Sequence, residues 1–402
     1  MLRTYLIVIS GHDQPGITRE VLRTLPSLDS IIDVQQILSE GMLTLHAVVR
    51  SMEEMNVIER SLLENLKPFS LDVSVHRANM EVLQNSPDQL VVTLMSPNLK
   101  AESLLLVTES ILSLGGNIDS IERIATYPVT ALEFRVSQGD IVNLRLSLSE
   151  IAITHHLDLA VQRGSLQRRG RHLIVLDVDS TLIQEEVIDL LGQSMGCERE
   201  IAEITEKTMR GDLDFESALR ERVQLLTGMP ASKLAEIYSS ITLSPGARTL
   251  IRVLKYLDYN VVFVSGGFDF VVQQLAEELG ADGFVANKLE ILNGYVSGNL
   301  VGDIIDRSGK ARALHDFAAR FTIPMARTIA IGDGANDIDM LNLAGLGIAF
   351  NAKPLVQRKA DTSINVPYLD SILYLLGITR LEIEQLNREL GINSFPPNQI
   401  EE

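Results

Sequence analysis

The sequence predicts an α/β protein in which a doubly wound parallel sheet with a helical insertion follows two smaller ferredoxin-like βαββαβ units. Two observations support this prediction. After about residue 172, short apolar runs without a polar face, such as Leu173–Leu176, alternate with helix-like segments, as expected of strands covered on both sides. Before that point, the order of expected strands and helices repeats at an offset of roughly 85 residues.

The first repeat occupies residues 1–82. A strand from Leu6 leads into a turn that opens a helix through Leu25. Strands over 31–38 and 42–50, a helix over 55–66 and a strand over 71–77 complete the order βαββαβ. The second repeat, residues 87–164, has expected strands at 90–95, 118–124, 130–136 and 157–162 and helices at 101–114 and 143–153.

In the larger domain, polar residues stand where the apolar strands end. Asp177 and Asp179 follow the first strand, Ser265 and Gly266 follow a second, and Gly332-Asp333-Gly334 follows a third. Ligands of open α/β sheets bind beyond the carboxyl ends of the strands, so we expect these groups to converge there. Two carboxylates in one small volume repel each other and favour a hard cation such as Mg²⁺.

Each of these signals has a simpler interpretation when it is taken alone. The two acids could form a helix cap with a salt-bridge partner, and Ser265-Gly266-Gly267 could be an ordinary strand-to-helix turn. Lys310, near the start of an expected helix to about residue 320, would usually be a solvated surface charge. The acid between two glycines at 332–334 is the more specific signal for a metal site.

Together and in this order, the four segments resemble the haloacid dehalogenase superfamily of aspartate-nucleophile phosphatases over residues 172–367. Within that superfamily the chain resembles the phosphoserine phosphatases. In the insertion between the first two strands, four residues fall on the positions with which that family recognises its substrate: Glu186, Met209, Phe215 and Arg222. The resemblance implies a haloacid dehalogenase-like phosphatase domain over 172–390, with a helical cap over 184–243.

The resemblance also implies an activity, which is hydrolysis of O-phospho-L-serine to L-serine and phosphate, the last step of L-serine biosynthesis. Asp177 would attack phosphorus and form an aspartyl-phosphate, and Asp179 would act as general acid and then as general base. Mg²⁺ would be held by Asp177, the backbone carbonyl of Asp179, and Asp333. The sequence shows no departure from the family at these positions.

The remaining site residues implied by the resemblance bind the substrate. Ser265, Gly266 and Lys310 would hold the phosphoryl oxygens, while Asn336, with Asp337, would steady the ligands. Glu186 and Arg222 would pair with the ammonium and carboxylate of phosphoserine. Without the resemblance, Glu186 and Arg222 would be read as surface charges, while Met209 and Phe215 could equally be core residues or residues that fit the shape of the substrate.

The two repeats resemble ACT domains, small modules that bind amino acids and pair edge to edge. The loop from Gly11 to Gly16 fits the ligand loop of that family, with Asp13 and Gly16 as expected contacts for L-serine as an effector. The second repeat lacks the Asp-x-Pro-Gly element, but Asn117 and Asp119 could complete a site across an interface. We expect a homodimer through the ACT domains, and pure oligomerisation without a ligand is the alternative.

Composition limits the possible partners. A net charge of −18 argues against nucleic acid, and no apolar run is long enough to span a membrane. The single cysteine, Cys197, fits a reducing compartment, so we expect a cytoplasmic protein. The basic stretch over 165–171 is interpreted as a linker between domains and not as a binding patch, and 391–402 as a frayed tail.

Two other functions remain open from the sequence. The same acids would serve a phosphatase or phosphotransferase of this superfamily that acts on another small phosphomonoester, without a need for the Glu186 and Arg222 pair. A third possibility is an amino-acid sensor that has lost catalysis, which the intact acids and Lys310 argue against.

Overall fold

The protein is described by a computed structural model. It describes residues 2–24, 30–78, 89–164, 168, 170, 172–210 and 212–392. The chain divides into two compact units, residues 1–86 and 87–402. The expected boundary between the two repeats, at 82–87, lies outside the described residues, as do most of the expected linker and tail.

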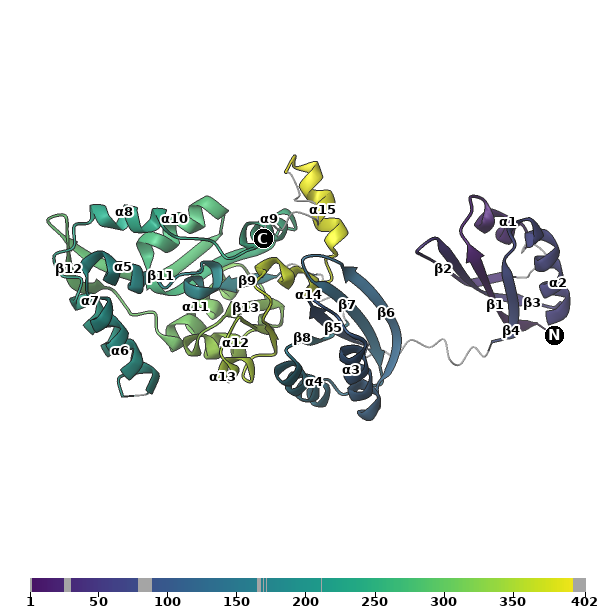
Figure 1. Ribbon diagram of the computed structural model, residues 1–402, viewed down its shortest axis with the longest axis horizontal. Coiled ribbons are helices and arrows are strands. Elements are labelled where there is room, and N and C mark those ends of the chain that lie inside the picture. Colours follow the sequence, from purple (N-terminus) through teal and green to yellow (C-terminus); the bar gives the residue numbers. More distant parts are fainter. Residues whose placement is uncertain are drawn as a thin grey trace. The chain divides into compact units, whose positions relative to one another are not determined.

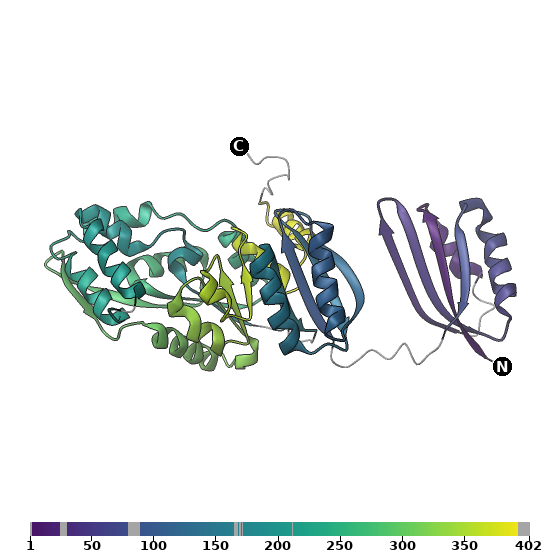
Figure 2. The same cartoon turned by 60° about the horizontal axis from the view of Figure 1, so that its bottom comes forward.

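The first unit is an antiparallel sheet with strand order β2-β3-β1-β4 and two helices on one face (Figure 2). Its elements are β1 (Arg3–His12), α1 (Ile17–Thr24), β2 (Ser30–Ser39), β3 (Met42–Ser51), α2 (Met55–Leu66) and β4 (Asp72–Arg77). Alternate residues of β1, namely Tyr5, Ile7 and Ile9, are buried against the helices. Every residue of the edge strand β2 is exposed, including Ile37 and Leu38. The expected βαββαβ order is confirmed.

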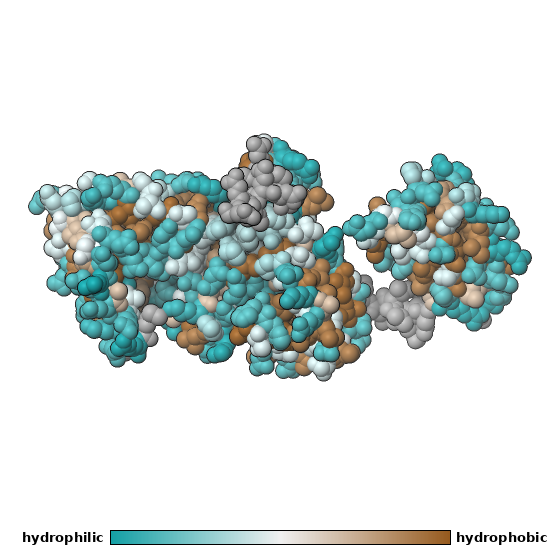
Figure 3. Space-filling model, viewed as in Figure 1, coloured by the Kyte–Doolittle hydropathy of each residue, from teal (hydrophilic) through white to brown (hydrophobic). Residues whose placement is uncertain are grey.

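The second ACT-like sheet has the same order of elements and the same topology, β6-β7-β5-β8 (Figure 1). Its elements are β5 (Leu90–Ser96), α3 (Ala101–Ser113), β6 (Asn117–Ala125), β7 (Thr130–Ser137), α4 (Ile141–His155) and β8 (Asp158–Arg163). The helices cover one face of this sheet with a core that includes Leu94 and Phe134. Their outer sides carry exposed apolar residues, including Leu112 and Leu146 (Figure 3).

The other face of this second sheet is covered by the larger domain. Every residue of β5 is buried. Met95 of this strand, together with Ala131 of β7 and Ala160 of β8, belongs to the core of the larger domain. The short helix α14 (Ile372–Leu375) lies directly beside this sheet (Figure 1). The second repeat and the larger domain therefore share a core, which no pattern within the repeat itself would have indicated.

Polar contacts fix the same junction. The carboxylate of Asp158, 2% exposed, accepts hydrogen bonds from Asn365 N at 2.8 Å, Asn365 Nδ2 at 3.0 Å and Val366 N at 3.1 Å. Arg168 lies in the expected linker, yet its guanidinium pairs with Glu133 at 2.7 Å and donates to the carbonyls of Tyr374 and Leu375. This linker residue is thus a buried structural contact.

The larger domain is built on a sheet with strand order β12-β11-β10-β9-β13-β14-β15, in which all neighbours are parallel except β11 and β12. The strands are β9 (Leu173–Leu176), β10 (Asn260–Phe268), β11 (Gly283–Leu292), β12 (Tyr295–Val301), β13 (Thr328–Gly332), β14 (Leu346–Phe350) and β15 (Thr362–Ile364). Ile174 and Leu176 of β9 pack on one face, while Leu173 and Val175 pack on the other. A run without polar residues is what this double burial requires.

Helices cover both faces of that sheet. One core includes α9 (Ala247–Tyr256) and α10 (Asp269–Leu279), and the opposite core includes α11 (Arg307–Arg320) and α12 (Ile338–Leu343). Two further helices are α13 (Pro354–Gln357) and α15 (Arg380–Glu389). In the part of the chain that the structure describes, no helix is long and apolar enough to cross a membrane.

The insertion between β9 and β10 is helical, as the sequence predicts. It contains α5 (Val187–Met195), α6 (Glu198–Arg210), α7 (Phe215–Gln224) and α8 (Ser232–Ser239). The hairpin of β11 and β12 turns at Asn293-Gly294, where both residues have positive φ. Two backbone hydrogen bonds join this hairpin to the insertion. Gly228 N donates to Val296 O at 2.9 Å, and Ala231 N donates to Gly294 O at 2.8 Å. The hairpin therefore braces the cap.

The contacts of Asp158 give a test of the junction. Replacement by Ala leaves three donors at a buried interface without their acceptor, so we expect Asp158→Ala to lower the free energy of unfolding by about 2–4 kcal/mol. Burial raises the pKa of Asp158 only to about 6, so the native carboxylate is ionised at neutral pH. Urea unfolding of the full chain at pH 7.5 measures the effect. Glu150→Ala, an exposed change on α4, is the control, and equal stability of both variants would contradict the assignment.

Candidate active site

The first site residues lie in a sharp turn at the end of β9. The chain forms a short π-helical turn over Val178–Leu182, within which Ser180 has φ 57°, in the left-handed region. Asp177 is 4% exposed and Asp179 is 9% exposed, so both carboxylates are nearly enclosed. The apolar strand thus carries two acids directly into a cavity at the carboxyl edge of the sheet, as the sequence predicts.

The carboxylate of Asp177 is held through one oxygen. Its Oδ1 accepts a hydrogen bond from Val178 N at 2.8 Å and pairs with Lys310 Nζ at 2.7 Å. Among the described residues no hydrogen bond to Oδ2 is found, so this oxygen can meet a ligand. Burial and the neighbouring carboxylates of Asp337 and Asp333 raise the pKa of Asp177 well above its usual range, and Lys310 opposes this shift.

Lys310 connects the acids that follow two neighbouring strands, Asp177 after β9 and Asp337 after β13. It lies in the first turn of α11, which begins with Asp306 as a cap that accepts from Gly309 N at 2.7 Å. Its side chain is fully buried, and Nζ contacts Asp177 and Asp337 at 2.7 Å each. Burial disfavours the ammonium, but the two carboxylates outweigh this effect and raise the pKa of Lys310 above its usual range. The lysine is therefore a permanent positive charge at the floor of the site.

Asp179 is held through both oxygens. Oδ1 accepts from Val187 N at 2.9 Å, at the start of α5, and Oδ2 accepts from the hydroxyl of Ser265 at 2.8 Å. A Cβ at Gly267 would lie 2.4 Å from Asp179 Oδ2, so only glycine leaves room for this carboxylate. Ser265, expected to hold phosphoryl oxygens, thus bonds Asp179 here.

The third segment places its acids beside the first. Asp333 Oδ1 accepts from the hydroxyl of Thr181 at 3.0 Å, and Asp337 Oδ2 accepts from Gly334 N at 2.9 Å. Carboxylate oxygens of Asp177, Asp333 and Asp337 all lie within 4.8 Å of one another. Burial and the charge of Asp337 raise the pKa of Asp333 to about 6. Such crowding of buried acids is relieved by a cation.

These residues fit a hard divalent cation such as Mg²⁺. Asp177 retains a free oxygen, and Asp333 has an oxygen beyond its bond to Thr181. Asp337 is engaged by Lys310 and Gly334 N, so it would support the two ligands. Because both side-chain oxygens of Asp179 already accept hydrogen bonds, its backbone carbonyl is the atom that it can offer.

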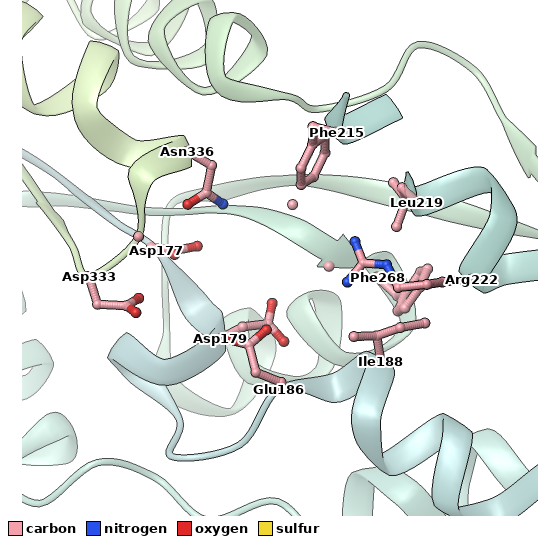
Figure 4. Close-up of a pocket in the computed structure, with 13 residues that line it drawn as sticks. Asp177, Asp179, Glu186, Ile188, Phe215, Leu219, Arg222, Phe268, Asp333 and Asn336 are labelled. Atoms are coloured by element: carbon pink, nitrogen blue, oxygen red, sulfur yellow. The ribbon is translucent and has the colours of Figure 1, made fainter. Parts of the chain in front are cut away.

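The cavity above these acids has a volume of about 110 Å³. Figure 4 shows Asp177, Asp179, Glu186 and Asp333 on one side and the guanidinium of Arg222 pointing in from the other. Other lining residues are Ile188, Phe215, Leu219, Gly266, Gly267, Phe268, Gly334 and Asn336. The side chain of Met209, on α6, lies outside the described residues.

The cap supplies one charge of each sign. Glu186 Oε1 accepts from the hydroxyl of Ser180 at 2.8 Å, and enclosure in the cavity, with the nearby charge of Asp179, raises its pKa to about 7. Burial lowers the pKa of Arg222, which Glu186 and Asp189 oppose. A cation and an anion on the cap, facing the acids of the sheet, can recognise a zwitterionic group on a ligand.

One supporting residue was not identified from the sequence. Asn287 of β11, 2% exposed, donates from Nδ2 to Gly266 O at 2.8 Å and accepts at Oδ1 from Ile305 N at 2.8 Å. It ties the loop after β10 to the segment before α11. In the sequence it is only one amide within an apolar strand. Its partners lie 21 and 18 residues away, so no local pattern indicates its role.

The expected effector residues lie in the two ACT-like units, Asp13 and Gly16 in the loop between β1 and α1, and Asn117 and Asp119 on β6. Asp13 is exposed, and its backbone N–H donates to Gly41 O at 2.9 Å. Gly16 has φ +101°, and a Cβ there would meet only Arg19 Nη2, at 3.6 Å. On the edge strand β6, Asn117 Nδ2 donates to Asp119 Oδ1 at 2.9 Å, and the Ser137 hydroxyl donates to the same atom at 2.8 Å.

Known proteins resemble this chain along nearly its full length. Family models for ACT domains match residues 3–76 and 89–162, and one for haloacid dehalogenase-like hydrolases matches 174–342. A phosphoserine phosphatase of Streptomyces coelicolor is 46% identical over 390 residues, which is 95% of this chain and 94% of that protein. A phosphoserine phosphatase of Mycobacterium tuberculosis is 42% identical over 385 residues, which is 94% of each chain.

Solved structures give the same result for the fold. A HAD family hydrolase from Salmonella enterica superposes with a TM-score of 0.64 at 27% identity. That superposition covers 71% of this chain and 98% of the other protein. The expected doubly wound domain with its helical cap is confirmed.

The acid cluster predicts how the metal is bound. Asp333→Asn would replace one of the carboxylates that could bind Mg²⁺ by an amide, so we expect the affinity for Mg²⁺ to fall at least about tenfold. Isothermal titration calorimetry with Mg²⁺ measures this change without any need for turnover. Asp339→Asn, an exposed change six residues later on α12, should leave the affinity at the parent value. Equal affinities of the two variants would show that Asp333 is not a ligand.

Proposed function

Because the chain belongs to the phosphoserine phosphatase family, we propose that it hydrolyses O-phospho-L-serine to L-serine and phosphate through an aspartyl-phosphate. One observation carries this proposal. A single small cavity contains Asp177 with a free oxygen on one side and Arg222 with Glu186 at the cap. It thus offers a nucleophile for phosphorus and a complementary charge for each end of an amino acid.

The chemistry follows from the contacts of the two acids. Asp177 Oδ2 forms the new bond to phosphorus while the bond from phosphorus to the serine oxygen breaks. Asp179, oriented by Ser265 and Val187 N, gives its proton to that departing oxygen. It then accepts a proton from the water that attacks the phosphoaspartate, which releases phosphate and restores Asp177.

Positive charge supports both steps. Lys310 holds Asp177 Oδ1, which fixes the rotamer that presents Oδ2, and remains charged throughout. Mg²⁺, bound by Asp177, Asp333 and the carbonyl of Asp179, would neutralise charge on the phosphoryl oxygens. The backbone at Gly266, steadied by Asn287, lines the cavity where those oxygens would lie.

The cap accounts for the choice of substrate. The guanidinium of Arg222 can bind the carboxylate of phosphoserine with two parallel hydrogen bonds, and Glu186 can receive the ammonium group. Phe215 contacts the loop at Gly266 closely, since a Cβ there would lie 3.1 Å from its ring. The alternative, a phosphatase for another small phosphomonoester, would use the same acids but gain nothing from this charge pair.

We also propose that L-serine is an effector at the first ACT domain and that the protein is a homodimer. The loop at Asp13 is followed by Gly16, whose missing side chain leaves backbone N–H groups accessible to a carboxylate. The fully exposed strand β2 offers unpaired backbone groups and apolar side chains to a second copy. A cytoplasmic location fits the single cysteine and the biosynthetic reaction.

The covalent step is tested by Asp177→Asn. An amide has nearly the same volume but is not a nucleophile toward phosphorus, so we expect turnover of phosphoserine to fall to background. Phosphate release in the presence of Mg²⁺ measures it, with circular dichroism to show that the fold is retained. Asp258→Asn, at a turn with φ 58°, is the control. If the variant turns over phosphoserine near the parent level, Asp177 is not the nucleophile. Measurable turnover by the parent itself excludes the sensor alternative.

Arg222 gives a test of substrate choice. Only phosphoserine presents a carboxylate, so Arg222→Met should lower kcat/KM for phosphoserine by roughly ten- to hundredfold more than for an aryl phosphate. That ratio corresponds to a charged hydrogen bond worth ~1.5–3 kcal/mol. Arg220→Met, on the same helix but paired with Glu216 at the surface, is the matched control. Equal losses on both substrates would assign Arg222 a structural role and favour the alternative phosphomonoester.

The effector proposal is tested by a serine titration. Gly16→Val places a side chain where the carboxylate of L-serine would approach and disfavours the positive φ, so the response of activity and molecular mass to serine should be lost. Gly115→Val, at φ +79° in the second repeat, controls for backbone strain alone. If parent and Gly16→Val respond alike, serine acts only at the catalytic site as product.

A further inference from the structure

The end of β10 departs from the regular pairing of the parallel sheet. Val264 pairs with Val285 of β11, and the next residues in register are Phe268 and Asn287. Three residues of β10, 265–267, therefore stand opposite a single residue of β11, and the backbone of β10 bulges at this point. Bulges occur often beside active sites, where they redirect the chain. The middle residue of this bulge lines the catalytic cavity.

The side chain of Asn287 holds this bulge from the neighbouring strand. It is 2% exposed, and its Nδ2 donates to the carbonyl of Gly266 at 2.8 Å. A carbonyl that a bulge removes from the regular ladder needs another donor when it lies inside the protein. A second bond lies within the bulge, where Gly267 N donates to the hydroxyl of Ser265 at 2.7 Å. These two bonds fix a backbone conformation that the strand pairing itself does not.

The oxygen of the same amide reaches a second segment of the site. It accepts a hydrogen bond from Ile305 N at 2.8 Å. Ile305 directly precedes Asp306, whose carbonyl accepts from Lys310 N at 2.9 Å in the first turn of α11. The two segments lie close together, since a Cβ at Gly266 would be 3.6 Å from Ile305 O. One buried side chain thus joins the bulge to the segment that carries the ammonium beside Asp177.

The two bonds together require an amide at this position. The side chain must donate to one backbone atom and accept from another, whereas a carboxylate of the same size can only accept. The groups that it joins belong to the two segments on which the phosphoryl oxygens would be held. We propose that Asn287 is a positioning residue for phosphoryl transfer, which sets the spacing between Gly266 and Lys310. This inference rests on the proposed function, because it concerns the same reaction.

Steady-state kinetics of Asn287→Asp in the full chain with Mg²⁺ test this role. The change keeps the size of the side chain but places an oxygen against the Gly266 carbonyl, so the bulge loses its donor. We expect kcat for phosphoserine to fall about ten- to hundredfold while KM stays within about threefold of the parent, because misplaced groups are felt in the transition state. An aryl phosphate presents the same phosphoryl group, so its kcat/KM should fall by the same factor. Asn299→Asp, an exposed change on the partner strand β12, should keep the kinetics of the parent.

A second variant guards against poor folding of the first. Asn287→Ala removes both bonds without burying a charge, and it should show the same fall in kcat when it is assayed well below its melting temperature. If either variant is folded by circular dichroism and keeps kcat within about twofold of the parent, Asn287 is only a structural amide and the proposal is overturned. A loss confined to KM would overturn it as well. A parent that hydrolyses the aryl phosphate but not phosphoserine would contradict the proposed function alone, and the aryl phosphate data would still decide the role of Asn287.

Discussion

The buried ammonium of Lys310 is the interaction on which the catalytic centre depends. It joins Asp177 after β9 to Asp337 after β13, and it arrives from α11, so three separate segments meet at one atom. Without this cation, two carboxylates with almost no exposure would repel each other in a medium of low polarity. With it, the acids can be packed closely enough to hold a divalent metal, and Asp177 is left with one oxygen for chemistry.

The sequence predicted the elements of this fold well because their patterns are local. Strands buried on both faces must be apolar throughout, as in β9. The acids that follow such strands can therefore be identified directly from the sequence. The junction between the second ACT domain and the catalytic domain was not predicted. Its contacts join residues about 200 apart, such as Asp158 and Asn365, and Arg168, which the sequence placed in a linker between domains, is buried against Glu133.

The site shows the same limit at a finer scale. All the expected polar groups of the sheet loops reach one cavity or its floor, but their partners could not be read from their spacing. Ser265 bonds Asp179, and Asn287 supports Gly266 from a strand that carries no recognisable motif. Glycine at 267 is explained only by the 2.4 Å that would separate its Cβ from Asp179. Residue types therefore indicated which chemistry the site performs. Only the three-dimensional contacts show which residues would react and which ones support them.

The shared core at the junction has a consequence for recombinant work on this enzyme. Tyr374 and Leu375 receive hydrogen bonds from Arg168, and their helix lies against the sheet that contributes Met95 and Ala131 to the same core. A shortened protein that begins at His172 would present this apolar side of α14 to water. Exposed apolar surface of that kind promotes aggregation. A soluble minimal phosphatase would therefore need polar replacements on α14, or it would need to retain the second ACT domain, which covers this apolar surface.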